Sequence, residues 1–108
     1  MNWWLYQIVA CIFVVVGLTY GRWYGEHNPG AGILIPWIVV ASMEVLAALF
    51  FLKSYITAPS FFQPWFLGTV VIALLGLGSS LVVFHEIPNI IHIFGAVLAL
   101  AGSVLLIL

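Results

Sequence analysis

Charged residues are what this sequence has least of. Asp, Glu, Lys and Arg together make up 5% of its 108 residues, whereas 66% of the residues are hydrophobic and the mean hydropathy is +1.31. A soluble domain carries about 25% charged residues, so this chain has too few of them to make a water-facing surface. We therefore expect an integral membrane protein.

Basic residues and cysteines are also scarce. Arg22 and Lys53 are the only two basic residues, and because nucleic-acid binding needs a basic patch, a nucleic-acid partner is excluded. Cys11 is the single cysteine and cannot form a disulfide within the chain. The first residues, MNWWLYQ, lack the positive region and cleavage site of a secretory signal, so the first apolar run is interpreted as a mature helix.

Four apolar runs fill most of the chain, over residues of about 3–24, 33–56, 61–84 and 88–108. Each is close to the length of about 20 residues that a spanning helix needs. Short segments with Gly and Pro separate them, which leaves no room for a soluble domain. Because lipid offers no partners to the backbone, such runs span only as helices. The prediction is an all-α integral membrane protein, with residues 1–108 forming a single domain of four transmembrane helices in a bundle.

One acidic residue, Glu44, lies near the middle of the second run. A carboxylate at the bilayer centre costs about 3 kcal/mol on insertion scales, so such a residue is a functional-site hypothesis by default. Ala41, Ala47 and Ala48 are close to it along the helix. This small-residue stripe predicts that Glu44 faces protein or a cavity rather than lipid.

Two hypotheses for Glu44 stay open. It is either a protonatable coupling group in a substrate cavity or a structural carboxyl that is hydrogen-bonded to Ser42, Tyr20 or a partner chain. For the first hypothesis, Tyr20 and Trp65 are the other candidate substrate contacts. Most aromatic residues near the helix ends are expected to anchor in the membrane interface, but Trp65 lies deeper than such anchors usually do.

The two basic residues fall at opposite ends of the bundle. Arg22 ends the first predicted helix and Lys53 ends the second, so both are expected to contact lipid headgroups. Orientation follows the bias of Lys and Arg across the membrane, and here that bias is absent. Orientation is therefore left to a partner, to insertion in both directions, or to hydrophobicity and the first helix.

The fourth run carries small residues on one side, at Gly95, Ala99 and Gly102. Small residues let helix backbones approach closely in lipid, so these three predict a dimer or helix-packing interface. His85, Glu86 and His92 precede or begin this run. Ligands on one helix face are usually three or four residues apart, whereas the two histidines are seven apart across a proline, which favours loop residues in water over a metal site. No metal and no cofactor are predicted.

Three short segments carry a family resemblance: VVVGLTYGRWY at 14–24, KSYI at 53–56 followed by Pro59, and GAVLALAG at 95–102. In that order they are similar to the E-V-x-G-x-x-x-x-K, L-x-Y-I-P and G-L-x-L-I-x-A-G motifs of the small multidrug resistance family, within the drug/metabolite transporter (EamA-like) superfamily. Gly17 and Arg22 fall on the Gly and Lys positions of the first motif. Trp65 lies near the tryptophan of the family's third helix.

This resemblance implies four helices, weakly specified topology and an antiparallel pair of chains that meet through helix four. It also implies transport, but the glutamate on which the family's proton-coupled antiport depends is Val14 here. Exchange of a drug for protons therefore does not carry over unchanged. Members of the superfamily without that glutamate include partners of obligate pairs and subunits of lipid-linked sugar flippases.

The function predicted from these observations is that of a small transporter or flippase subunit for an amphipathic or lipid-like substrate. It would act as a homodimer or with a heteromeric membrane partner, in the inner (plasma) membrane of a bacterium or archaeon. The alternative is a non-transporting, structural or accessory subunit of a larger membrane complex. An enzyme is not expected, because the sequence offers no nucleophile–base pair and no metal constellation.

Overall fold

The computed structural model describes residues 2–107, which form four α-helices. They are α1 (Trp3–His27), α2 (Leu34–Thr57), α3 (Phe62–Val82) and α4 (Ile90–Ile107). This confirms the predicted all-α fold class with four helices. The boundaries of the second and third helices differ from the predicted ranges by one or two residues, and α4 begins two residues later than predicted.

The first helix is longer than predicted, because it continues to His27 through residues that were expected to form a loop. Its last turn carries an ion pair between Arg22 and Glu26, four residues apart, which is the spacing that stabilises a helix. The His27 ring stacks on Trp23 with 4.5 Å between the ring centroids. The Asn28 side chain then donates to the Tyr24 carbonyl oxygen at 3.1 Å and so covers the helix end.

Three of the helices, α1, α2 and α3, are long and apolar enough to cross a membrane. Large hydrophobic side chains on them are exposed, among them Val45 at 68%. Such a surface belongs in lipid, and the chain is a membrane protein. Helix α4 is apolar but shorter, with 18 residues, so its role as a fourth span stays a prediction.

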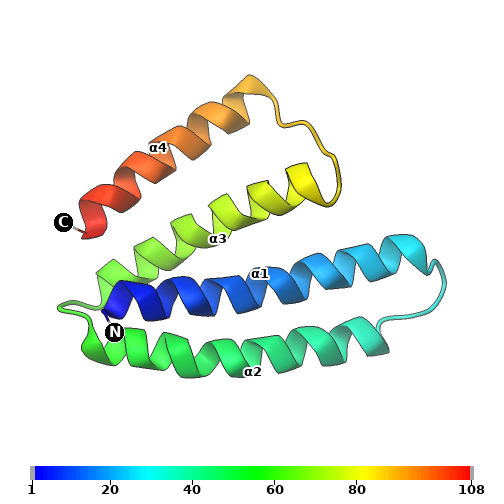
Figure 1. The fold of residues 1–108 in the computed structure, drawn as a ribbon, viewed down its shortest axis with the longest axis horizontal. Helices are drawn as coiled ribbons and strands as arrows, with labels where there is room; N and C mark the ends of the chain where they lie inside the picture. The colour runs from blue at the N-terminus through cyan, green and yellow to red at the C-terminus, as the bar shows by residue number, and fades with distance from the viewer. Residues whose placement is uncertain (1, 108) are drawn as a thin grey trace.

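The helices lie side by side in the order α2, α1, α3, α4 (Figure 1). The chain measures 46 × 35 × 18 Å along its principal axes, so it is a shallow open layer. Helix α1 is the central element because it packs against both α2 and α3, whereas α4 packs mainly against α3. The buried core is accordingly small and lies around α1.

The contact between α1 and α2 is made close by small residues. A Cβ atom on Gly17 would lie 3.1 Å from Met43 Cβ, and Ala47 on the same side of α2 is buried. Near the other end of α1, Ser54 Oγ donates to the Trp3 carbonyl oxygen at 2.9 Å. These contacts set the register of an antiparallel pair, in which Gly17 is level with Met43.

The contact between α1 and α3 is polar instead. Three α1 side chains donate to α3: Gln7 Nε2 to Pro64 O at 2.8 Å, Cys11 Sγ to Gly68 O at 3.6 Å and Thr19 Oγ1 to Ser79 Oγ at 3.1 Å. Interhelical hydrogen bonds of this kind are worth about 0.6–2 kcal/mol each in a membrane. They fix the rotation of α3 about its axis, and with it the side chains that α3 presents beside α1.

Candidate functional site

The three packed helices line an open groove of about 320 Å³, which we call the aromatic groove. Its lining residues come from α1, α2 and α3: Gln7, Phe51, Tyr55, Trp65, Gly68, Thr69 and Ile72. Three of these are aromatic and exposed or half-buried, so the groove offers flat apolar surfaces. Concave apolar sites with a few polar groups are the usual form of a ligand pocket.

Trp65 lies in this groove, although 59% of the residue is exposed. Its ring lies 6.3 Å from the ring of Phe61 between centroids, and Phe61 in turn contacts Tyr55 at 5.3 Å. The sequence singled out Trp65 because it lies slightly deeper than an interfacial anchor usually does. In the groove, Trp65 lies together with the aromatic side chains of Phe51 and Tyr55.

Glu44 is exposed on α2, and within residues 2–107 its carboxylate has no hydrogen-bond or ion-pair partner. The expectation that it faces protein or a cavity is wrong for the single chain. Ala47 is the alanine that packs against α1, while Ala41 and Ala48 lie on the adjoining strip of α2 together with Glu44. Ser42 is not its partner, because Ser42 Oγ donates to the Ile38 carbonyl oxygen at 2.8 Å.

Glu44 nevertheless shares a helix face with the aromatic groove. Residues seven apart on a helix lie on nearly the same face, and Phe51 follows Glu44 by seven residues. Ala48 and Tyr55 continue this stripe at helical spacing. The carboxylate therefore stands on the groove side of α2, about 10 Å along the helix axis from Phe51.

Val14 is level with Glu44 on the neighbouring helix. Gly17 faces Met43, so Val14, three residues earlier on an antiparallel helix, lies within one turn of Glu44 in height. Val14 also follows Gln7 by seven residues and shares its face of α1. Val14 and Glu44 therefore lie at similar heights on neighbouring helices.

Tyr20 lies apart from these residues. It lines a second groove of about 390 Å³ between α1 and α3, together with Thr19 and Trp23. Its ring is 6.3 Å from that of Trp23 and 6.0 Å from that of Tyr24, between centroids. At about 100° per residue, Tyr20 falls on the side of α1 opposite to Gln7, so the structure does not bring it together with Glu44 and Trp65.

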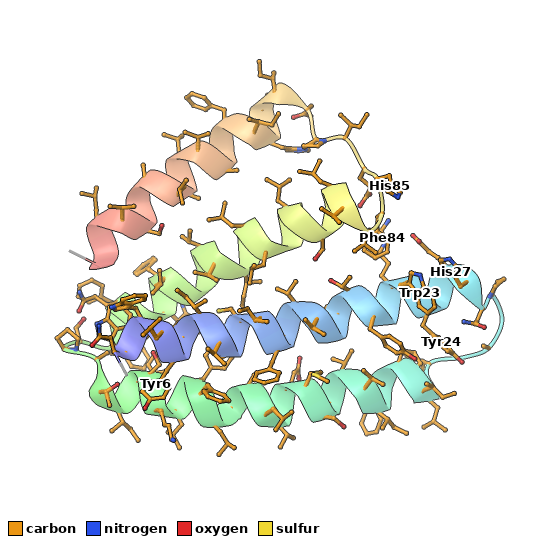
Figure 2. The ribbon with its side chains drawn as sticks, in the orientation of Figure 1. Tyr6, Trp23, Tyr24, His27, Phe84 and His85 are labelled. Atoms are coloured by element: carbon orange, nitrogen blue, oxygen red, sulfur yellow. The ribbon has the colours of Figure 1, made fainter. Side chains whose placement is uncertain are left out.

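Arg22 has protein partners rather than lying free. It is 3.2 Å from Glu26 (Nε to Oε1) and 3.5 Å from Glu86 (Nη2 to Oε2), and its guanidinium carbon is 4.9 Å from the Phe84 ring centroid. Figure 2 shows Phe84 at the end of α3, close to the end of α1. Lys53 Nζ lies 5.7 Å from the Tyr6 ring centroid. Contacts of either residue with lipid headgroups stay predictions.

The small residues of α4 are not closely packed against α3. Gly95 and Ala99 line a groove of about 360 Å³ between the two helices, which His92 also lines. A Cβ atom on Gly95 or Gly102 would meet nothing within 4 Å. The chain by itself therefore leaves this face open to further contact.

The loop before α4 contains a residue with an unusual backbone angle and a residue that caps the start of the helix. His85 has a positive φ of 55°, and the Asn89 Oδ1 atom accepts a bond from the His92 N–H at 2.9 Å. Over the described part of the chain, no three His, Cys, Asp or Glu side chains are grouped so that they could hold a metal ion.

Two features of the site were not predicted from the sequence. Gln7 was not singled out, although it is a polar residue inside an apolar run, and it lines the groove together with Thr69. The pairing of Arg22 with Glu86 joins residues 64 apart. In the sequence, only their opposite charges, at the ends of the first and third runs, pointed to this pair.

No protein-family model, no curated protein and no solved structure matches the chain.

Proposed function

We propose that the chain is a small membrane transporter or flippase subunit for an amphipathic or lipid-like substrate, similar to the small multidrug resistance family. What supports this proposal is the helical spacing that puts Glu44 on the same face of α2 as Phe51 and Tyr55, which line the aromatic groove. A carboxylate beside aromatic walls suits a substrate with a polar or cationic end and an apolar body. Trp65 and Tyr55 would contact the apolar part of the substrate.

Glu44 takes the coupling role in this proposal. An ionisable residue inside the membrane usually faces a protein interior or a water-filled cavity, and an exposed Glu44 in the single chain needs such surroundings. Glu44 lies at about the same height in the bundle as Val14, the position that matches the glutamate of the resembling family. This supports the hypothesis that the acidic group is on the second helix here instead of the first.

A second protein surface would complete the site. The layer of four helices leaves Glu44 and the aromatic groove on an open face, and Gly95, Ala99 and Gly102 on α4 are open to close packing. A homodimer or a heteromeric membrane partner is therefore part of the proposal, with the surrounding lipid as the other contact. The membrane would be the inner (plasma) membrane of a bacterium or archaeon.

The test is flux into proteoliposomes across an imposed pH gradient, with an amphipathic fluorescent dye and, separately, a fluorescently labelled phospholipid. The Glu44→Gln variant should lose the pH-dependent part of the flux while it still assembles. Glu26→Gln is the matched control, because Glu26 is exposed at the end of α1 and paired with Arg22. Normal pH-dependent flux in Glu44→Gln would remove the coupling role.

The second candidate is a non-transporting accessory subunit of a larger membrane complex. The open layer favours it, since α4 has one main partner in the chain. Under this hypothesis the purified protein always co-migrates with a larger complex and neither binds nor moves a substrate alone. An enzymatic role is not proposed under either hypothesis.

A further inference from the structure

Gln7 is a buried polar residue of which one end is satisfied and the other is not. Only 1% of the residue is exposed, and Nε2 donates to Pro64 O at 2.8 Å. Its Oε1 atom is buried and has no hydrogen-bond partner within residues 2–107. Buried polar atoms are nearly always paired, so an unpaired carbonyl oxygen marks a place where a donor is favoured.

The orientation of this amide is fixed by its surroundings. Pro64 O is an acceptor, so the atom beside it must be the amide nitrogen, and the remaining atom is the oxygen. Gly68 leaves room for this amide, because a Cβ atom there would collide with Gln7 Nε2. Two acceptors cannot bond to each other, so the oxygen cannot take over the bond to Pro64 O and stays in need of a donor.

Gln7 also lines the aromatic groove, between Tyr55 on α2 and Trp65 on α3. Trp65 is 59% exposed, and the side-chain hydrogen bonds between α1 and α3 come from Gln7, Cys11 and Thr19, so the Trp65 side chain can move without breaking them. A ligand that stacks in the groove would bring any donor on its edge close to the only unpaired buried side-chain oxygen in the described residues.

We propose that the aromatic groove binds a flat apolar ligand with an N–H or O–H donor, and that this donor bonds to Gln7 Oε1. The ligand displaces an exposed wall side chain to reach the covered oxygen. A ligand of the same shape without the donor keeps the stacking but leaves the oxygen unpaired. The site thus selects for a hydrogen-bond donor, independently of charge.

This inference rests on the proposed function for the role of the groove, and it adds the chemical class of what the groove takes. It does not need Glu44, which lies about 10 Å further along α2. Binding and transport can therefore fail separately.

The experiment uses the full chain in lipid nanodiscs, with ¹⁵N-labelled glutamine. Gln7 and Gln63 are the only two glutamines, so their side-chain amide resonances report on the groove and on a reference site. The probes are indole, which has an N–H donor, and 1-methylindole, which has none. Indole should shift the Gln7 resonance at saturation, and 1-methylindole should shift it less.

Affinities of both probes are then measured for the native protein and for Gln7→Met, which removes the oxygen and keeps the chain length. The ratio of indole to 1-methylindole affinity should be about tenfold higher in the native protein, the worth of one hydrogen bond. Comparing ratios cancels the partition of each probe into lipid. The matched control Gln63→Met should keep the native ratio.

Three results would overturn the proposal: no binding of either probe, equal ratios in the native protein and Gln7→Met, or a Gln7 resonance that does not respond to saturating indole. The last result is measured on native protein, so it decides even where Gln7→Met does not fold. Donor-selective binding without flux in proteoliposomes keeps the Gln7 site and removes the transport proposal. Flux without donor selectivity keeps the transport proposal and removes the Gln7 site.

Discussion

Arg22 Nη2 lies 3.5 Å from Glu86 Oε2, and this contact ties the end of α1 to the connection between α3 and α4. The two residues are 64 positions apart, and the guanidinium also lies over Phe84. Both charged side chains are about half exposed, so the contact stands at the edge of the layer. It nevertheless helps to place the start of α4, which otherwise packs mainly on α3.

We expect a small coupling energy between Arg22 and Glu86. Exposed pairs are worth about 0.2–1 kcal/mol and are screened by salt, so Glu86→Gln should lower stability by that amount and less at high salt. A double-mutant cycle with Arg22→Gln, followed by thermal unfolding in detergent, measures the coupling. Zero coupling at low salt would show that the contact does not hold in solution.

Gly68→Ala should be destabilising, because the end of the Gln7 side chain must move and give up its bond to Pro64 O. The added Cβ would collide with Gln7 Nε2 in the polar contact between α1 and α3, and overpacking of this kind costs about 1–3 kcal/mol. Gly76→Ala on the same helix is the control, because a Cβ there meets nothing within 4 Å. The loss at Gly68 should shrink in a Gln7→Ala background, and an unchanged loss would locate the strain elsewhere.

Ser54→Ala should weaken the contact between α1 and α2. Ser54 is fully buried and its hydroxyl donates to the Trp3 carbonyl oxygen at 2.9 Å, a bond worth about 0.6–2 kcal/mol in a membrane. Ser42→Ala is the matched change on the same helix, because the Ser42 hydroxyl bonds within α2. Equal stability of the two variants in thermal unfolding would contradict the interhelical bond.

Water should reach position 44 if Glu44 faces a transport pathway. A Glu44→Cys variant in proteoliposomes is then expected to react with a membrane-impermeant thiol reagent, since thiols react as the hydrated thiolate. Cys11 is fully buried and should stay silent. The control is Val45→Cys, which is exposed on the next strip of α2; labelling at 45 but not at 44 would count against a hydrated pathway.

The sequence alone was enough to find the helices, and its errors lie at their ends and in their rotation. Long apolar runs must be helical in lipid whatever surrounds them, so four elements followed directly. The end of α1 was missed because Gly25 suggested a turn, whereas the Arg22–Glu26 pair and the stack of Trp23 on His27 extend the helix. Glu44 was expected to face protein because several neighbours are alanines, and of those only Ala47 is buried.

What the sequence by itself determined is a membrane protein of apolar helices with one acidic residue near the middle of the second, because hydropathy and length act locally. Only the tertiary structure decided that Gln7 meets Pro64, that Arg22 meets Glu86, and that Trp65 and Tyr55 line one groove. The physical reason is that the helices are apolar nearly all round. Such helices carry little information about their rotation, so a few buried polar contacts between distant residues select the packing.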